Sequence, residues 1–246
     1  CASEGLSSRW QIAGLPRPQD SYFTDCSAQN VGKLQTESCT GSCFTYMFED
    51  PDIVPTQGGA TVVLVVRGCH TTITSVVANR TSSRDESYCE YDFSHPMANS
   101  KGELVTVRAL SEFCSSSNCN NRQSTAPNAF SDCDQQTVSS LVGGQVLSCY
   151  ECTPQEGKNC KDKDRKCSSK KYCSKQTVFG GGHQVAKSCS NINILGVDNS
   201  CVSYDVLTSP GGVTVRNKYS HCYCRDQQFC NEVSQPTIRL AFLITL

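Results

Sequence analysis

The sequence predicts an all-β protein made of two small disulfide-rich domains in tandem. The first observation is the cysteine content: 19 of the 246 residues are cysteine, a density typical of small scaffolds that depend on bridges for stability. The second is that apolar and polar residues alternate in short β-branched runs, with no helical period. The third is an internal repeat, which indicates two diverged copies of one unit.

Strand candidates are spread along most of the chain. Each is a short run rich in β-branched or aromatic side chains, as expected for antiparallel pairs. They cover Phe44–Glu49, Ala60–Arg67, Val105–Ala109, Val146–Glu151, Ser174–Phe179, His183–Ser188, Val202–Val206 and Val213–Tyr219.

The repeat divides the chain into two domains. The sequence Val-Thr-Val-Arg occurs at Val105–Arg108 and again at Val213–Arg216, and each arginine stands six residues before a cysteine. A segment rich in Asn, Ser, Gln and Gly lies between the copies and reads as a flexible linker. We therefore expect a first domain at 1–120, a linker at 121–147, a second domain at 148–231 and an apolar tail at 232–246.

The overall charge excludes strong electrostatic steering. With 22 Lys and Arg against 23 Asp and Glu, the formal net charge is −1, so nucleic acid is not an expected partner. So many bridges require an oxidising compartment, and we expect an extracellular protein. The chain begins at Cys1 without an initiator Met, which fits a signal peptide already removed or a fragment.

Ten cysteines in the second domain carry a resemblance to a known family. The domain opens on Leu147-Ser148-Cys149-Tyr150-Glu151-Cys152 and closes on Cys230-Asn231. This arrangement resembles the three-finger domains of the lymphocyte-antigen-six and urokinase-receptor family, which implies two tandem all-β three-finger (snake-toxin-like) domains. The resemblance also implies the bridges Cys149–Cys173, Cys152–Cys160, Cys167–Cys189, Cys201–Cys222 and Cys224–Cys230.

The first domain departs from the family pattern at its start, because Cys1 stands where a Cys-x-x-Cys pair is expected. Analogy with the second domain suggests the bridges Cys39–Cys69 and Cys1–Cys43. Two partners are open for Cys114: the repeat favours Cys89, whereas the local spacing before Asn120 favours Cys119.

One cysteine is left over, because nine precede Cys149. Cys133, in the linker, is the obvious candidate. It could bridge back to the first domain, pair between chains, or stay unpaired.

Other uses of these residues are less well supported. Cys149-x2-Cys152 offers half of a zinc site, but no second Cys-x-x-Cys follows. The same pair could serve a thiol–disulfide oxidoreductase, yet the strand-to-helix context of that motif is missing. The four histidines belong to no hydrolase or phosphate-binding motif. We expect no metal, no cofactor and no enzymatic activity.

Three segments are candidates for contact with a protein partner. Phe179 precedes Gly180–Gly182, which read as a hairpin turn rather than a phosphate loop. Tyr46 and Phe48 lie on one strand, and Lys163 and Arg165 belong to the basic stretch 158–171, which could contact an acidic partner or anionic glycans. The alternatives are cross-strand packing for the aromatic residues and a solvated loop tip for the basic stretch.

The end of the chain resembles a short glycosylphosphatidylinositol (GPI) attachment signal, with Asn231 or Ser234 as the attachment residue. It is too short to span a bilayer. A truncated tail or a disordered end of a secreted protein is the alternative. Asn79-Arg80-Thr81 is an acceptor sequence for N-glycosylation.

These expectations combine into a functional hypothesis. The resemblance implies recognition rather than catalysis, so we expect a non-enzymatic extracellular binding protein. It would be held on the outer leaflet of the plasma membrane by a GPI anchor and would modulate a receptor, channel or adhesion partner. The alternative is a soluble secreted inhibitor or ligand of an extracellular protein.

Overall fold

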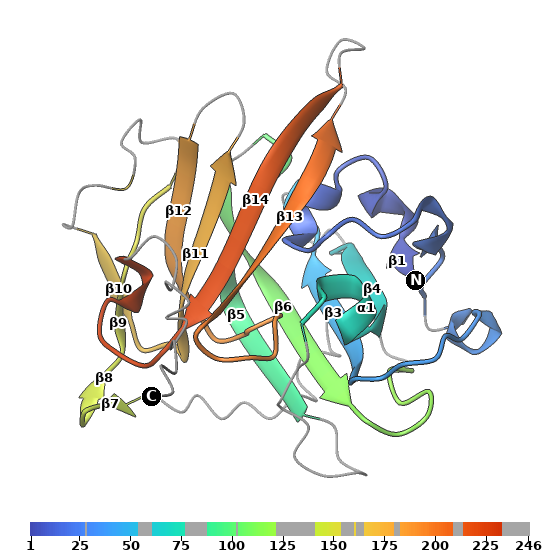
Figure 1. The fold of residues 1–246 in the computed structure, drawn as a ribbon, viewed down its shortest axis with the longest axis horizontal. Coiled ribbons are helices and arrows are strands. Elements are labelled where there is room, and N and C mark those ends of the chain that lie inside the picture. Colours follow the sequence, from blue (N-terminus) through green and yellow to red (C-terminus); the bar gives the residue numbers. More distant parts are fainter. Residues whose placement is uncertain are drawn as a thin grey trace, which may run out of the picture.

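The computed structural model describes residues 1–27, 29–53, 61–76, 88–101, 103–121, 141–153, 160, 165–179, 183–208 and 214–232. These residues are mostly strands joined by short turns (Figure 1), which confirms the predicted all-β, disulfide-rich class. The strands are β1 (Ala2–Ser3), β2 (Phe23–Thr24), β3 (Cys43–Glu49), β4 (Val63–Cys69), β5 (Tyr88–Ala98), β6 (Leu104–Cys114), β7 (Leu141–Val142), β8 (Gln145–Val146), β9 (Ser148–Tyr150), β10 (Lys166–Ser168), β11 (Tyr172–Phe179), β12 (His183–Ser190), β13 (Ser200–Thr208) and β14 (Val215–Cys224). The helical turns are α1 (His70–Thr74), η1 (Glu4–Leu6), η2 (Trp10–Ala13), η3 (Asp20–Tyr22), η4 (Val31–Lys33) and η8 (Cys230–Glu232).

Two main sheets carry the same topology. The first has the strand order β2-β1-β4-β3-β6-β5, and the second has the order β12-β11-β14-β13. The order β4-β3-β6-β5 in the first matches β12-β11-β14-β13 in the second, with antiparallel pairing throughout these strands. Strands β9 and β10 form a separate antiparallel pair, as do β7 and β8. The internal repeat is thus a repeat of topology.

The register of the central strands shows the same repeat. Cys43 of β3 lies opposite Cys69 of β4 and Cys114 of β6 in the strand ladders. The equivalent position on β11 is Cys173, which pairs with Cys189 of β12 and Cys224 of β14.

The second half contains five disulfides. They are the five pairs that the family resemblance implies: Cys149–Cys173, Cys152–Cys160, Cys167–Cys189, Cys201–Cys222 and Cys224–Cys230.

The first half follows this pattern only in part. Cys39 is bonded to Cys69, as analogy suggests. The suggested Cys1–Cys43 bridge is wrong, because Cys1 is bonded to Cys26 and Cys43 is a free thiol. The backbone shows why. The backbone of Cys1 forms two hydrogen bonds with the backbone of Arg67, and Cys152 forms the same two with Lys187. Arg67 and Lys187 are equivalent positions, because each stands two residues before a cysteine at or next to the end of its strand, Cys69 in β4 and Cys189 in β12. Cys1 therefore takes the place of Cys152, whose bridge is also local, and not the place of Cys149.

Cys114 is bonded to Cys119, which settles the choice that the sequence left open. Cys89 lies opposite Glu112 in the β5–β6 ladder, where the second sheet has Cys201 opposite Cys222. Glu112 thus occupies the position of a cysteine partner. Cys89 is disulfide-bonded, but its partner lies outside the described residues, as does Cys133.

A single hydrophobic core joins the two halves. It draws aromatic and aliphatic side chains from β3, β4 and β6 and from β11, β13 and β14, and the N-terminal turns close one side of it. Figure 1 shows β11–β14 lying across β5 and β6. Burying one large apolar side chain contributes about 1.5–3 kcal/mol, so this contact stabilises both halves. The largest fully buried side chains in this core are Trp10, Phe44, Tyr46, Phe48, Phe113, Tyr172 and Tyr223.

Strand β5 is an edge strand with a bulge. Its register against β6 shifts between Asp92 and His95, where three steps on β5 match two on β6. Pro96 follows, and an edge strand tolerates proline because that residue has no N–H to donate. The extra residue changes which side chains face the second sheet.

The eight expected strands all overlap observed ones, but β1, β2, β5, β7 and β10 were not expected, and β5 is the longest of these. Within the described residues, no helix is long and apolar enough to cross a membrane.

Candidate binding surface

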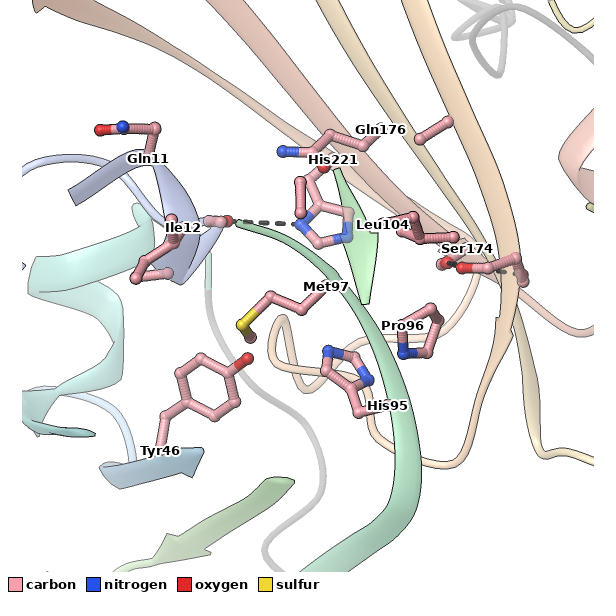
Figure 2. Close-up of a pocket in the computed structure, with 15 residues that line it drawn as sticks. Gln11, Ile12, Tyr46, His95, Pro96, Met97, Leu104, Ser174, Gln176 and His221 are labelled. Atoms are coloured by element: carbon pink, nitrogen blue, oxygen red, sulfur yellow. Dashed lines mark hydrogen bonds between the residues drawn. The ribbon is translucent and has the colours of Figure 1, made fainter. Parts of the chain in front are cut away.

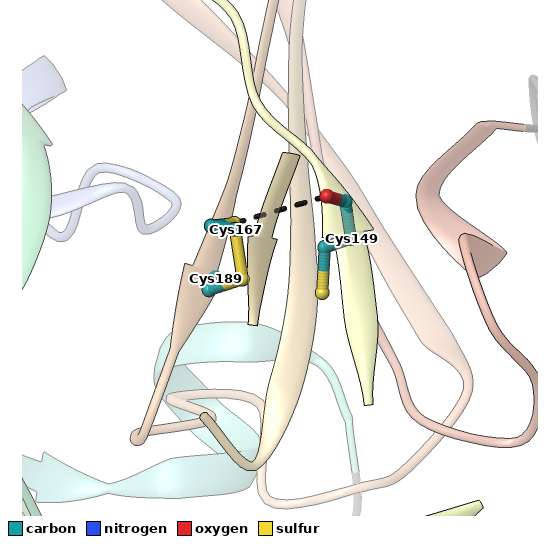
Figure 3. A group of neighbouring side chains, drawn as sticks. All are labelled: Cys149, Cys167 and Cys189. Atoms are coloured by element: carbon teal, nitrogen blue, oxygen red, sulfur yellow. Dashed lines mark hydrogen bonds between the residues drawn. A yellow bond between two sulfur atoms is a disulfide. The ribbon is translucent and has the colours of Figure 1, made fainter. Parts of the chain in front are cut away.

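Disulfides hold the strands of the second half together near their bases. Cys149 and the Cys167–Cys189 bridge lie beside one another between β9, β10 and β12 (Figure 3), with the three sulfur atoms within 4.8 Å of one another. Each of these sulfurs belongs to a disulfide, so none is a thiolate that could bind zinc. The cluster is therefore a covalent clamp that fixes the hairpins relative to one another.

The β11–β12 hairpin carries an exposed aromatic side chain at its tip. Phe179 ends β11, pairs with His183 across the ladder, and is 44% exposed. An exposed aromatic ring on a strand that is paired on both sides is a suitable contact residue, since little conformational entropy is lost on binding. Phe179 remains a candidate.

Two exposed aliphatic residues lie at the open end of the β3–β4 hairpin. Ile53 follows β3 and Val62 precedes β4, and they are 42% and 44% exposed. The sequence analysis did not single out either residue. The available signal was an apolar residue on each side of the segment 54–61, which contains Pro55.

The proposed contact roles of Tyr46 and Phe48 are wrong. Both side chains are almost fully buried, at 1% and 0% exposure. Their rings pack on each other, with centroids 4.8 Å apart, inside the core that the two sheets share. The sequence did not reveal that a second sheet covers this face of β3.

The basic stretch is divided between surface and interior. Arg165 is exposed, and the Nζ of Lys166 lies 5.2 Å above the ring of Phe229. Lys163 lies outside the described residues. Lys170 is not a surface cation: it forms an ion pair with the buried Asp92 of the first half.

A second buried carboxylate reinforces this boundary. Glu90 on β5 is completely buried, and one of its oxygens accepts a hydrogen bond from the hydroxyl of Tyr172 at 2.6 Å. Its other oxygen accepts from the backbone N–H of Asn193 at 2.8 Å. A buried carboxylate is tolerated when hydrogen bonds replace its hydration. Glu90 and Asp92 therefore attach β5 to the second half through polar contacts that sequence reasoning missed.

A small cleft lies between the halves (Figure 2), with a volume of about 40 Å³. Room for one water requires about 10–15 Å³, so the cleft can hold a few waters but no organic ligand. The polar groups and ring systems around it include Gln11, Gly14, Tyr46, His95, Gln176 and His221.

Asn231 is a structural residue. It is 2% exposed, and its side-chain amide donates to the carbonyls of Tyr150 and Ser174 while its Oδ1 accepts from the N–H of Tyr150. A GPI anchor is joined to the main-chain carboxyl group, so attachment at Asn231 would place it at a residue whose side chain is buried in the closing turn. Ser234 and the possible glycosylation residue Asn79 lie outside the described residues.

Asn120 takes the equivalent place in the first half. Its amide donates to the carbonyls of Phe44 and Gly68, at 3.3 and 3.4 Å. Phe44 follows Cys43 as Ser174 follows Cys173, so the two Cys-Asn closures act on equivalent positions.

Comparison of the sequence with models of known protein families and with curated proteins found no match.

Proposed function

We propose that the chain is a non-enzymatic extracellular binding protein built from two three-finger domains of the lymphocyte-antigen-six and urokinase-receptor type. The observation that carries the proposal is the combination of bridged strand bases with exposed apolar side chains at hairpin tips. The five bridges of the second half are the set that this family resemblance implies.

The shared core restricts where a partner can bind. The face of β3 that carries Tyr46 and Phe48 is covered by the second half, so the contact surface must lie elsewhere. Phe179, Ile53 and Val62 are exposed at hairpin ends, and these tips are the proposed contact surface. A partner of matching chemistry is an extracellular or membrane protein with an apolar pocket or groove for such a side chain.

The proposed location is the outer leaflet of the plasma membrane, through a GPI anchor attached after the second domain. Ser234 is the preferred attachment residue, because Asn231 is held in the closing turn. Treatment of expressing cells with phosphatidylinositol-specific phospholipase C tests this location, using an internal tag in segment 121–147. Release into the medium supports the anchor, whereas secretion without the enzyme favours a soluble inhibitor or ligand.

Binding is tested with the secreted chain, multimerised and screened against individually expressed extracellular proteins. We expect at least one specific partner, whose binding falls about tenfold or more in Phe179→Ser, since loss of a central apolar contact typically costs ≥ about 1.4 kcal/mol. Val146→Ser is the matched control, because Val146 on β8 is also partly exposed, at 39%. Equal binding by both variants would remove Phe179 from the contact surface.

A further inference from the structure

Three of the four histidines lie where the two halves meet. The Nε2 of His70 on α1 lies 2.9 Å from the carbonyl oxygen of Ile194. The Nδ1 of His95 on β5 lies 3.2 Å from the hydroxyl of Ser190, and the Nδ1 of His221 on β14 lies 3.3 Å from the carbonyl oxygen of Gly14. Each contact joins the first half to the second, and we call the three together the histidine joint.

His221 is held in its neutral form by its surroundings. A carbonyl oxygen can only accept, so Nδ1 carries the proton that is donated to Gly14. A second proton would add at Nε2 and place a cation in the cleft between the sheets (Figure 2). Burial has the largest effect on the pKa of His221 and lowers it to about 4. The Gly14 contact raises this pKa, and the neighbouring His95 lowers it by a smaller amount.

The ionisable groups around the cleft come from few elements. Strand β5 contributes His95, with Asp92 behind it at 3.9 Å, and β3 contributes Tyr46. The N-terminal turn faces His221 with Gln11, Ile12, Ala13 and Gly14, and β11 and β12 face it with Ser174, Gln176, Ala186 and Ser188, none of which titrates near neutral pH.

His221 and His95 therefore face a common space, but their surroundings differ. Asp92 can balance a charge on His95, although Lys170 already shares that carboxylate. Among the described residues that line the cleft, no carboxylate stands beside His221. A proton on His221 would therefore place a charge in a confined space with no neighbouring anion among these lining residues to balance it.

No disulfide between two described cysteines joins the halves. Every disulfide whose two cysteines are both described joins residues within 1–119 or within 149–230. Within the described part of the chain, the joint therefore depends on noncovalent contacts, whereas each half is cross-linked internally.

We propose that acid loosens the histidine joint, so that the N-terminal turn at Trp10–Gly14 separates from β14 while the bridged sheets persist. This device goes beyond the proposed binding function and does not depend on it. It would change the relative placement of the hairpin tips when the protein passes from a neutral to an acidic compartment.

The direction follows from proton linkage. The joined state binds a proton on His221 less readily than the separated state, whose histidine has an ordinary pKa of about 6.5. The joint is therefore fully stable above about pH 6.5 and weakens as the pH falls toward 4. Between pH 7.5 and pH 5 the equilibrium constant for opening should rise about 10- to 30-fold.

Amide hydrogen exchange of the full chain at pH 7.5 and pH 5.0, corrected for the intrinsic effect of pH on exchange, measures this opening. We expect the corrected exchange rate to rise at pH 5.0 in peptides that contain Trp10–Gly14 and β14, with no comparable rise in the exchange rate of β3. Unchanged protection at the joint, or an equal loss of protection in β3, would overturn the proposal.

A pair of variants assigns the effect. His221→Gln retains an N–H donor but does not titrate, so the acid-induced rise should shrink several-fold. His183→Gln, at the start of β12, should leave the rise intact. If His221→Gln does not fold, NMR titration of the ¹³C-labelled histidines in the unaltered protein replaces it. The His221 resonance must then titrate in the same pH range as the opening, and titration without opening would contradict the proposal.

Discussion

Lys170 and Asp92 form an ion pair across the boundary between the two halves of the molecule. The Lys170 Nζ lies 2.9 and 3.0 Å from the two carboxylate oxygens. The Asp92 side chain is 1% exposed, and it also accepts a hydrogen bond from the backbone N–H of Asn191 at 2.9 Å. The pair fixes β5 against the turn that precedes β11.

Replacing Lys170 by methionine should destabilise the protein by about 3 kcal/mol, because it leaves a buried carboxylate without its cation. Urea unfolding at pH 7.5 with the disulfides intact measures the loss. Lys101→Met, at an exposed turn, is the control and should stay within about 0.5 kcal/mol of the unaltered protein. A cost below about 1 kcal/mol for Lys170→Met would mean that His95 and Asn191 suffice to hold Asp92.

Asp92 should also make stability fall in strong acid. Burial by itself raises its pKa, but the nearby His95 and Lys170 together with the Asn191 N–H outweigh burial and lower the pKa to about 2. The ionised form therefore stabilises the fold above about pH 3.8, and about 2 kcal/mol is lost as the pH falls from 3.8 toward 2. Asp92→Asn should lack this loss. The free energy of unfolding of both proteins is measured between pH 5 and pH 2, and an equal loss in the two would contradict this prediction.

Gly14 should resist substitution more than Gly143, which also has a positive φ. Its φ is +66°, and an added Cβ would lie 3.0 Å from the Nδ1 of His221. Gly14→Ala should cost about 2–3 kcal/mol, from the left-handed backbone and from displacement of the ring. Gly143 has a φ of +60° but open space around it, so Gly143→Ala should cost about 1 kcal/mol. Thermal or urea unfolding measures both losses of stability. Equal losses would show that the His221 ring moves away from the added Cβ without an energetic cost.

The two Cys-Asn closures should differ in strength. Asn231 makes three side-chain hydrogen bonds of 3.0 Å while nearly fully buried, and Asn231→Ala should cost about 3 kcal/mol. Asn120 makes longer bonds of 3.3 and 3.4 Å and should cost about 1 kcal/mol when replaced by alanine. Unfolding free energies of the two variants provide the comparison, and a larger loss for Asn120→Ala would reverse the ranking.

The sequence predicted the strands whose inward side chains are apolar. It missed β5 because the inward positions there hold Glu90, Asp92 and His95, which bind the second half, while Phe93 is 60% exposed. This pattern reverses the alternation by which a half-buried strand is recognised. Burial of a polar side chain by a distant segment cannot be read from the strand alone.

The repeat misled the pairing of Cys114 for a related reason. Aligning Val105–Arg108 with Val213–Arg216 matches Cys114 to Cys222, but the ladders match Cys114 to Cys224 and Glu112 to Cys222. The two repeated motifs are offset by two residues, which preserves the inward and outward faces of a strand. The apolar pattern therefore looks the same in either alignment, and only the pairing of neighbouring strands distinguishes them. Cross-strand packing was the alternative for Tyr46 and Phe48, but their burial under a second sheet could not be predicted because it depends on contact between the halves.

The bulge in β5 determines which side chains in the rest of that strand face the second half and which face solvent. Glu90 and Asp92 face the second half, and without the extra residue Ser94 would come next on that face, with His95 and Met97 turned to solvent. Because of the shift between Asp92 and His95, the buried residues are His95 and Met97. Deleting one residue at Phe93 or Ser94 would thus reverse the faces of the rest of the strand. The His95 imidazole would leave the cleft, and the Met97 thioether would leave the core. The packing of the two halves against each other therefore depends on one inserted residue in the edge strand β5.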